Sequence, residues 1–201
     1  KDFINALGIS TAPYRQVTSA DELDAALDAL GRPAVLKTTR MGYDGKGQVM
    51  IGPDLTAQDA WDAMGGGEGI LEGYVDFERE VSAIVARGLD GSTACFDVVD
   101  NVHQNHILAE TRAPSTIPPA LAERAQEIAC KLSDAFDMAG LLAVEMFVTT
   151  TGELLVNELA ARPHNSGHWT IDACHASQFE QFIRAVAGLP LGDPSRHSDA
   201  V

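Results

Sequence analysis

The chain has 201 residues, of which 45% are apolar and 21% charged, and its 14 basic and 29 acidic side chains give a formal charge of −15. This composition is typical of a globular protein and excludes collagen, coiled coils and wholesale disorder. The negative charge disfavours binding to nucleic acid or to an anionic membrane. An anionic ligand would need a local nest of donors, or a divalent cation between the ligand and carboxylates.

The three cysteines, Cys95, Cys130 and Cys174, are odd in number and widely spaced, without a CxxC motif. This pattern indicates neither a disulfide framework nor a structural zinc, and it favours a reducing, cytoplasmic location. No run of about 18 apolar residues predicts a membrane span. The chain begins at Lys1 without a methionine, from which we expect a piece of a longer protein.

Hydrophobic spacing and turn residues predict short helices and strands in the first half of the chain. Asp90-Gly91 is a strong hairpin signal between two strands. The expected elements are a helix over 21–30, a strand over 33–38, a polar loop over 41–48, a strand over 49–51, a helix over 56–64, and strands over 69–75, 78–87 and 92–100.

The second half begins with a proline-rich link and then an apolar stripe at helical spacing. The stripe predicts a helix over 121–136, and strands over 141–148 and 153–159 flank the turn residues Thr151-Gly152. A last helix over 177–187 ends at Gly188. Because strands and helices do not alternate regularly, the order favours α+β lobes over a doubly wound parallel sheet.

A glycine-rich loop follows a lysine that lies inside an apolar strand. The loop Gly42-Tyr43-Asp44-Gly45-Lys46-Gly47-Gln48 has three glycines, whose backbone N–H groups can form an anion nest. It lacks the spacing of a Walker loop, and it also fits a flexible hairpin tip. Lys37 favours the anion site, because an unpaired lysine is rarely buried in a strand unless it meets an anion.

Glu145 and Glu158 each interrupt an otherwise apolar strand. A two-residue turn at Thr151-Gly152 would place them directly opposite each other, with Cβ atoms roughly 5 Å apart. Their repulsion of about 3 kcal/mol would then favour protonation of one carboxylate or a cation between them. A divalent cation with oxygen ligands is the economical expectation, and an edge hairpin with both carboxylates in water is the alternative.

The segment 160–169, Ala-Ala-Arg-Pro-His-Asn-Ser-Gly-His-Trp, follows Glu158 directly and is dense in hydrogen-bond donors. It predicts a site for an anion or a polar substrate, with a solvated loop as the alternative. Cys174 lies beside His175 and close to Asp172, which offers weak support for a cysteine nucleophile. An inert buried thiol is the more usual case at such a position.

The order of these motifs strongly resembles the ATP-grasp superfamily. Within it, four segments resemble the 5-(carboxyamino)imidazole ribonucleotide synthases, which carboxylate without biotin in purine synthesis. The segments are residues 43–48, 77–82, 101–103 and 157–170, of which the last is very specific. The resemblance covers about residues 1–192 and implies an ATP-grasp fold, with two α+β lobes and the nucleotide between them.

The resemblance implies roles for individual residues. Lys37 and the loop would hold ATP phosphates, residues Glu72 to Val75 would line the adenine, and Glu80 would accept hydrogen bonds from the ribose. Glu145 and Glu158 would bind Mg²⁺. The expected nucleotide-binding residues are Lys37, Gly42, Tyr43, Asp44, Gly45, Lys46, Gly47, Gln48, Glu72, Gly73, Tyr74, Val75, Glu80, His103, Asn157 and Glu158.

Catalysis is expected from Arg162 and His164, with Tyr43 and Asp44 approaching from the loop. Bicarbonate and aminoimidazole ribonucleotide would meet Arg162, His164, Asn165 and Ser166. The family more often has Ala-Pro-Arg where this chain has Ala160-Ala161-Arg162, which leaves the roles intact.

The implied reaction uses ATP and Mg²⁺ to carboxylate aminoimidazole ribonucleotide with bicarbonate through carboxyphosphate, without nucleic-acid or membrane partners. A small lobe over about 31–101 and a larger lobe over about 102–192 with 1–30 are expected, without the family's flanking lobes. Full-length members are expected to form homodimers. Two alternatives stay open: a superfamily ligase for another acid such as formate, and a nucleotide-binding fragment without turnover.

Overall fold

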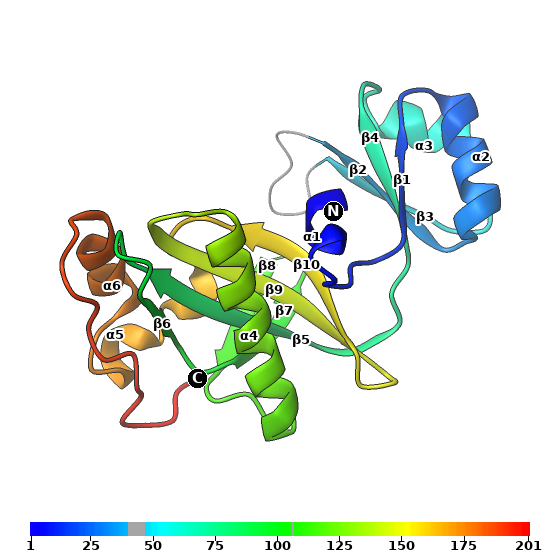
Figure 1. Cartoon of the computed structure of the whole chain (residues 1–201). Helices are drawn as coiled ribbons and strands as arrows, with labels where there is room; N and C mark the ends of the chain where they lie inside the picture. Colours follow the sequence, from blue (N-terminus) through cyan, green and yellow to red (C-terminus); the bar gives the residue numbers. More distant parts are fainter. Residues whose placement is uncertain (40–46, 106) are drawn as a thin grey trace. The chain divides into compact units, whose positions relative to one another are not determined.

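The computed structural model describes residues 1–39, 47–105 and 107–201, which form two compact units. The smaller unit comprises Ala12–Asp76 with Asn105–Ile107, and the larger unit comprises Lys1–Thr11, Phe77–Gln104 and Leu108–Val201. Both combine helices with antiparallel strands, so the predicted α+β class is confirmed (Figure 1). Among the described residues, no helix has the length and apolar character needed to cross a membrane.

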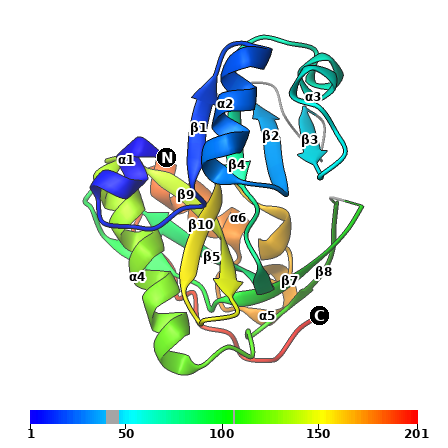
Figure 2. The same cartoon turned by 90° about the vertical axis from the view of Figure 1, so that its right-hand side faces the viewer.

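The smaller unit is a four-stranded sheet with two helices packed on it (Figures 1 and 2). Ser19 and Thr56 cap the helices, because their side chains accept hydrogen bonds from the N–H groups of Glu22 and Asp59. In sheet order the strands are β1 (Tyr14–Val17), β4 (Gly69–Gly73), β2 (Ala34–Thr38) and β3 (Gln48–Ile51), and the helices are α2 (Ala20–Leu30) and α3 (Ala57–Met64).

The larger unit is a six-stranded sheet with α4 (Pro119–Ala135) along one face (Figure 1). Its central strand β5 (Phe77–Arg87) pairs with β9 (Gly140–Thr149) over almost its whole length. The other strands are β10 (Leu154–Ala160), β7 (Val99–Gln104), β8 (Ile107–Arg112) and β6 (Thr93–Cys95), and the remaining helices are α1 (Asp2–Ala6), a 3-10 turn (Asn165–Gly167), α5 (Thr170–Ala173) and α6 (Gln178–Val186).

Alternation along β5 and β9 divides the residues of the sheet between two cores. Val81 and Val85 of β5, with Val144 and Met146 of β9, pack with α4 residues such as Leu132. The opposite face buries Ile84, Ala86, Leu141 and Ala143 with Phe96, and Phe182 of α6 packs against this second core. On this second face the positions that follow Ala143 and precede Ile84 are polar, and they form the site described below.

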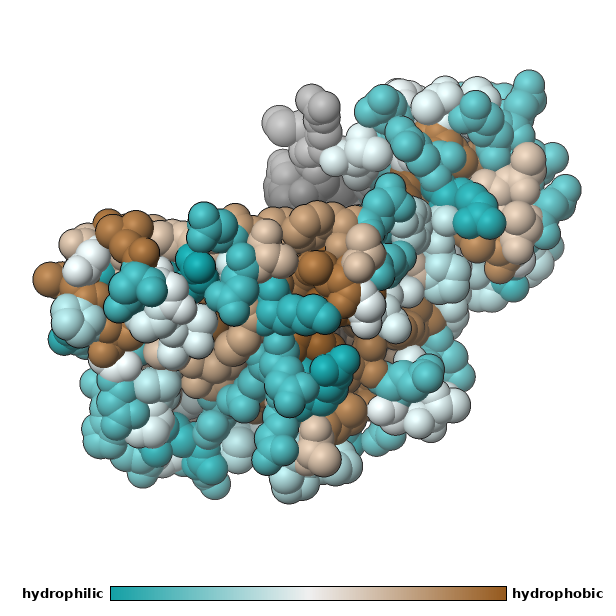
Figure 3. Space-filling model, viewed as in Figure 1, coloured by the Kyte–Doolittle hydropathy of each residue, from teal (hydrophilic) through white to brown (hydrophobic). Residues whose placement is uncertain are grey.

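Helix α6 carries apolar residues on its outer side as well. Phe179, Ile183, Val186 and the following Leu189 are exposed by 40–59%. Figure 3 shows hydrophobic atoms gathered at this end of the larger unit.

Two expectations about organisation differ from the structure. Residues 12–30 belong to the smaller unit rather than the larger, because β1 pairs with β4 and Leu23 and Leu27 enter that core. Residues 77–101 belong to the larger unit rather than the smaller, because β5 pairs with the distant β9. The strand expected over 92–100 is also two strands, with a break at Phe96, which is buried in the second core.

Candidate active site

Glu145 and Glu158 are directly paired across β9 and β10, as predicted, although the turn differs from the prediction. Next to the turn, Val156 pairs with Met146, which would bring Asn157 opposite Glu145 if the ladder continued regularly. A β-bulge intervenes, so that Asn157 and Glu158 together oppose Glu145. The turn has three residues rather than two, with Gly152 at φ +81° in the left-handed region.

Polar residues continue from this pair along the sheet face away from α4. Ser82 of β5 lies opposite Glu145, and Glu80 lies opposite Asn101 of β7. Directly paired residues share a face, so these side chains line one surface. Ser82 and Asn101 are buried, and the Asn101 amide donates a hydrogen bond to the Ser82 hydroxyl. Sequence reasoning assigned no role to either residue, although a hydroxyl inside the apolar run 81–86 was a usable signal.

His164 contacts Glu145, with 2.9 Å between Nε2 and Oε1. The histidine is 8% exposed and follows the edge strand β10 through Pro163. Its Nδ1 accepts a hydrogen bond from the backbone N–H of Ser166 at 3.3 Å and lies 2.8 Å from the Ser166 hydroxyl. Because Nδ1 is an acceptor, the neutral ring carries its proton on Nε2 and donates it to Glu145.

The surroundings of Glu145 favour its ionised form. Burial alone would raise the pKa of this carboxyl group. The hydrogen bond from His164, with the positive charges of His103 and Arg162, outweighs burial and lowers the pKa below its ordinary value. Glu145 is therefore a carboxylate at neutral pH, as a ligand of a hard cation has to be.

Glu80 and His103 form a second acid–imidazole pair, with 2.5 Å between Oε2 and Nδ1. The hydrogen bond to Glu80 raises the pKa of His103 above its ordinary value, against the opposing effect of partial burial. The charges of Glu145 and Glu158 act in the same direction as Glu80. The structure thus gives Glu80 a protein partner in addition to the ribose expected from the sequence.

The segment after β10 presents some of its donors outward and holds others inside. Arg162 and Asn165 are exposed, and the Arg162 guanidinium donates to the Pro163 carbonyl at 2.9 Å. Ser166 is fully buried beneath His164. The structure therefore brings His164 and Ser166 together with Glu145, and it leaves Arg162 and Asn165 at the surface.

In the smaller unit, Lys37 forms an ion pair with Glu72, at 2.9 Å between Nζ and Oε2. The assumption that Lys37 is unpaired was therefore wrong, and the protein itself supplies an anion for it. Lys37 also pairs in register with Gln48 on β3. Gly73 ends β4, and Tyr74 is half exposed. The expected loop residues Gly42, Tyr43, Asp44, Gly45 and Lys46 lie outside the described residues.

Gly47 is the first described residue of the glycine-rich loop. It has φ +75°, and a Cβ placed there would lie 2.6 Å from the Thr38 hydroxyl oxygen. Its carbonyl accepts a hydrogen bond from the Thr38 N–H at 2.7 Å. Glycine is therefore required at this position by both conformation and space.

Comparison with known proteins identifies the family of this chain and several similar proteins. An ATP-grasp domain model matches residues 2–179. The chain belongs to the ATP-grasp family. It is 52% identical over 203 residues to an N5-carboxyaminoimidazole ribonucleotide synthase of Brucella melitensis, covering 100% of this chain and 56% of that protein. It is 48% identical over 192 residues to the synthase of Bacillus subtilis, covering 96% of this chain and 50% of that protein.

Solved structures of such synthetases share the fold. One, in complex with ADP, has a TM-score of 0.94 and 45% identity, covering 98% of this chain and 52% of that chain. Another, from Aspergillus clavatus with ADP and 5-aminoimidazole ribonucleotide, has a TM-score of 0.90 and 28% identity, covering 98% of this chain and 52% of that chain. The chain spans about half the length of the curated relatives it matches.

The carboxylate pair of this ATP-grasp chain suits Mg²⁺. Glu145 is ionised and partly buried, whereas Glu158 is exposed. Mg²⁺ is usually held by one or two carboxylates together with water and substrate phosphates. Among the described residues no group of three or more His, Cys, Asp or Glu side chains is arranged to hold a metal ion. A Mg²⁺ ion bound by this pair would need further ligands, such as phosphate oxygens and water.

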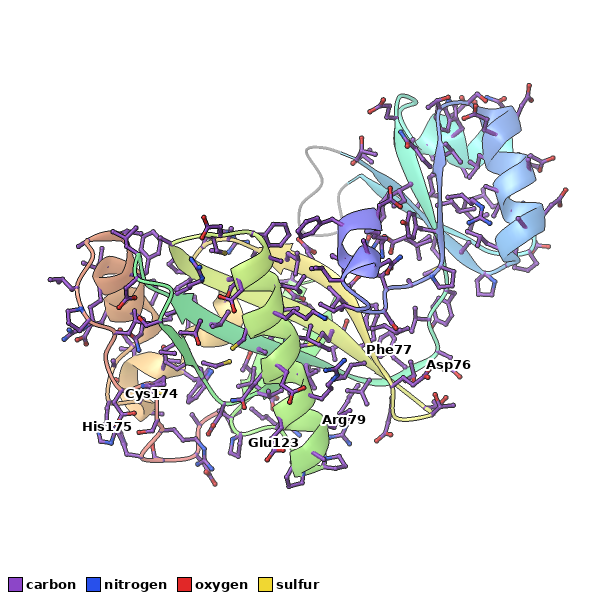
Figure 4. The ribbon with its side chains drawn as sticks, viewed as in Figure 1. Asp76, Phe77, Arg79, Glu123, Cys174 and His175 are labelled. Atoms are coloured by element: carbon purple, nitrogen blue, oxygen red, sulfur yellow. The ribbon has the colours of Figure 1, made fainter. Side chains whose placement is uncertain are left out.

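The cysteines of this ATP-grasp chain are free thiols. Burial raises the pKa of Cys174 to about 11, so this thiol is protonated at neutral pH. Figure 4 places Cys174 and His175 beside α5. The weakly supported cysteine nucleophile therefore gains nothing from the structure.

Proposed function

We propose that the protein carrying this chain carboxylates aminoimidazole ribonucleotide with bicarbonate and ATP, and that it requires Mg²⁺. The observation that carries this proposal is the contact of His164 with Glu145, directly beside the Glu158 pairing. This contact supports the proposal, because an imidazole that lies within the segment most similar to the synthases donates to a carboxylate expected to bind the metal. The names of the relatives support the same reaction.

In the proposed reaction, a bicarbonate oxygen attacks the γ-phosphorus of ATP, and the bond to the bridging oxygen breaks to release ADP. The amine nitrogen then attacks the carboxyl carbon of carboxyphosphate, or the CO2 that it releases, and phosphate leaves. The amine also loses a proton, which the departing phosphate takes up as hydrogen phosphate, while His164 would keep Glu145 in place through its Nε2–H. Arg162 suits bicarbonate, because its guanidinium binds two oxygens at once.

Glu145 and Glu158 would hold Mg²⁺, which when bound would neutralise negative charge on the phosphates. Lys37 and backbone N–H groups of the glycine-rich loop would hold phosphates in the smaller unit. Glu72, which pairs with Lys37, fixes the direction of the ammonium group. The free thiols agree with a cytoplasmic location.

The test compares acid substrates. We would assay the 201-residue chain, and a hybrid in which it replaces the matching region of the Brucella melitensis relative. The chain alone should bind Mg-ATP weakly, and the hybrid should release ADP and phosphate only with bicarbonate and form the carboxylated ribonucleotide. Formate-dependent ADP release would indicate the other ligase class instead, and nucleotide binding without turnover by the hybrid would indicate a binding module.

Lys37→Met should weaken binding of Mg-ATP by about tenfold to a hundredfold, because a hydrogen bond from a charged donor to phosphate is lost. The melting temperature should also fall, since Glu72 is buried and loses a cationic partner. Isothermal titration and thermal unfolding of the chain measure the two effects. Lys37→Arg, which keeps the charge, should recover most of the melting temperature. Unchanged nucleotide affinity in Lys37→Met would show that the lysine serves Glu72 alone.

A further inference from the structure

Helix α6 directs two fully buried glutamine side chains into the larger unit. Gln178 and Gln181 have 0% exposure. A buried primary amide needs partners for its oxygen and its nitrogen. Each of the two finds both partners on the backbone of a single residue, His164 for Gln178 and Gly192 for Gln181.

The Gln178 side-chain amide forms two hydrogen bonds with the backbone of His164. The His164 N–H donates to Gln178 Oε1 at 2.9 Å, and Gln178 Nε2 donates to the His164 carbonyl at 2.8 Å. Because one planar amide binds both groups, it fixes the position and the orientation of the His164 backbone. The ring of His164 is held separately, by Ser166 at Nδ1 and by Glu145 at Nε2.

The turn that follows His164 is also connected to Gln178 by hydrogen bonds. The Gln178 N–H donates to the Thr170 hydroxyl at 2.9 Å, and this hydroxyl donates to the Gly167 carbonyl at 2.6 Å. A Cβ on Gly167 would lie 2.5 Å from Gln178 Oε1 and 2.7 Å from Ile84 Cδ1. Glycine at 167 therefore lets the turn pack against the Gln178 amide and the sheet.

We propose that Gln178 is a positioning residue of the site, which sets the place and the tautomer of His164 relative to Glu145. The inference rests on the proposed role of His164 in carboxyl transfer. Gln178 contacts the His164 backbone, so its effect reaches the chemistry through His164. The donors around Nδ1 and the acceptor at Nε2 hold one neutral tautomer only while the backbone keeps its present position.

Gln181 provides a matched control within the same helix. Its Nε2 donates to the Gly192 carbonyl at 2.7 Å, and its Oε1 accepts from the Gly192 N–H at 2.9 Å. Gln178→Met and Gln181→Met each keep the side-chain volume and remove two hydrogen bonds to backbone, so we expect similar losses of melting temperature. Only Gln178→Met releases His164.

Two readouts separate positioning from stability. In the hybrid, Gln178→Met should lower kcat for carboxylation by about tenfold to a hundredfold, because misplacement of a reacting group by about 1 Å can cost that much, while KM for ATP stays unchanged. In the chain itself, ¹⁵N shifts of His164 at one neutral pH should change from a single Nε2–H tautomer to a mixture. Gln181→Met should change neither.

Equal losses of kcat in the two variants, with the His164 tautomer unchanged in both, would overturn the inference. Gln178→Glu serves if Gln178→Met does not fold, since it keeps the acceptor for the His164 N–H and removes the donor to the carbonyl. A changed tautomer in a hybrid without carboxylation would support positioning by Gln178 and would refute the proposed function instead.

Discussion

Glu158→Gln should abolish Mg²⁺-dependent ADP formation by the hybrid and leave the fold intact. The amide removes the negative charge from the exposed half of the pair, so that Glu145 alone would face the cation and its phosphates. Electrostatic stabilisation of the transition state often contributes most to the rate of such reactions, and we expect a loss of at least about a hundredfold. Because Glu158 is exposed, the melting temperature should change little.

Glu153→Gln is the control for this prediction. Glu153 is also exposed and lies at the turn of the same hairpin, outside the site. The Glu153→Gln variant should leave ADP formation unchanged, as measured by a coupled assay over a range of Mg²⁺ concentrations. Normal turnover by Glu158→Gln would remove the carboxylate pair from the mechanism.

Arg162→Leu should remove bicarbonate-dependent phosphate release and leave ATP affinity within a few fold. The guanidinium is exposed beside Pro163, two residues before His164 and four after Glu158, where the acid substrate would wait. Loss of a bidentate charged contact with a small anion costs about 1.5–3 kcal/mol per hydrogen bond. Two such bonds would lower the rate by about a hundredfold or more at subsaturating bicarbonate.

Arg162→Lys and Arg124→Leu are the two control variants for this prediction. Lysine keeps the charge without the planar fork, so Arg162→Lys should raise KM for bicarbonate and retain part of the rate. Arg124 is exposed on α4 and pairs with Glu127, so Arg124→Leu tests the loss of a surface charge alone. An equal loss of ATP binding by Arg162→Leu would assign this residue to the phosphates.

The local pattern of the sequence was sufficient for helices α2, α3, α4 and α6 and for the carboxylate pair, whereas the short helices α1 and α5 were not predicted. The long apolar stripe of α4, and the helical spacing of apolar residues in α2, predict helices close to their observed bounds. Long-range pairing was not visible in the same way. Nothing near Phe77 indicates that β5 pairs with β9 about 60 residues later, and this pairing decides which unit holds Glu80 and His103.

The route to the carboxylate pair shows a limit of a different kind. A regular two-residue hairpin led to the observed partner through an incorrect turn. The bulge could have been found from the core-facing residues, since Leu154, Val156 and Leu159 all pack toward α4 although the last two are three positions apart. The hold of Gln178 on His164 gave no local signal, because it joins the start of a helix to a turn 14 residues earlier.

The β-bulge lets strand β10 place Glu158 opposite Glu145 while both Val156 and Leu159 remain in the core. Asn157 is the extra residue, so Val156 and Leu159 keep their places in the core whether one residue or two lie between them. A chain shortened by Asn157 would still bring Glu158 opposite Glu145 in regular register. Position 157 can therefore accept other side chains without moving Val156 or Leu159 out of the core.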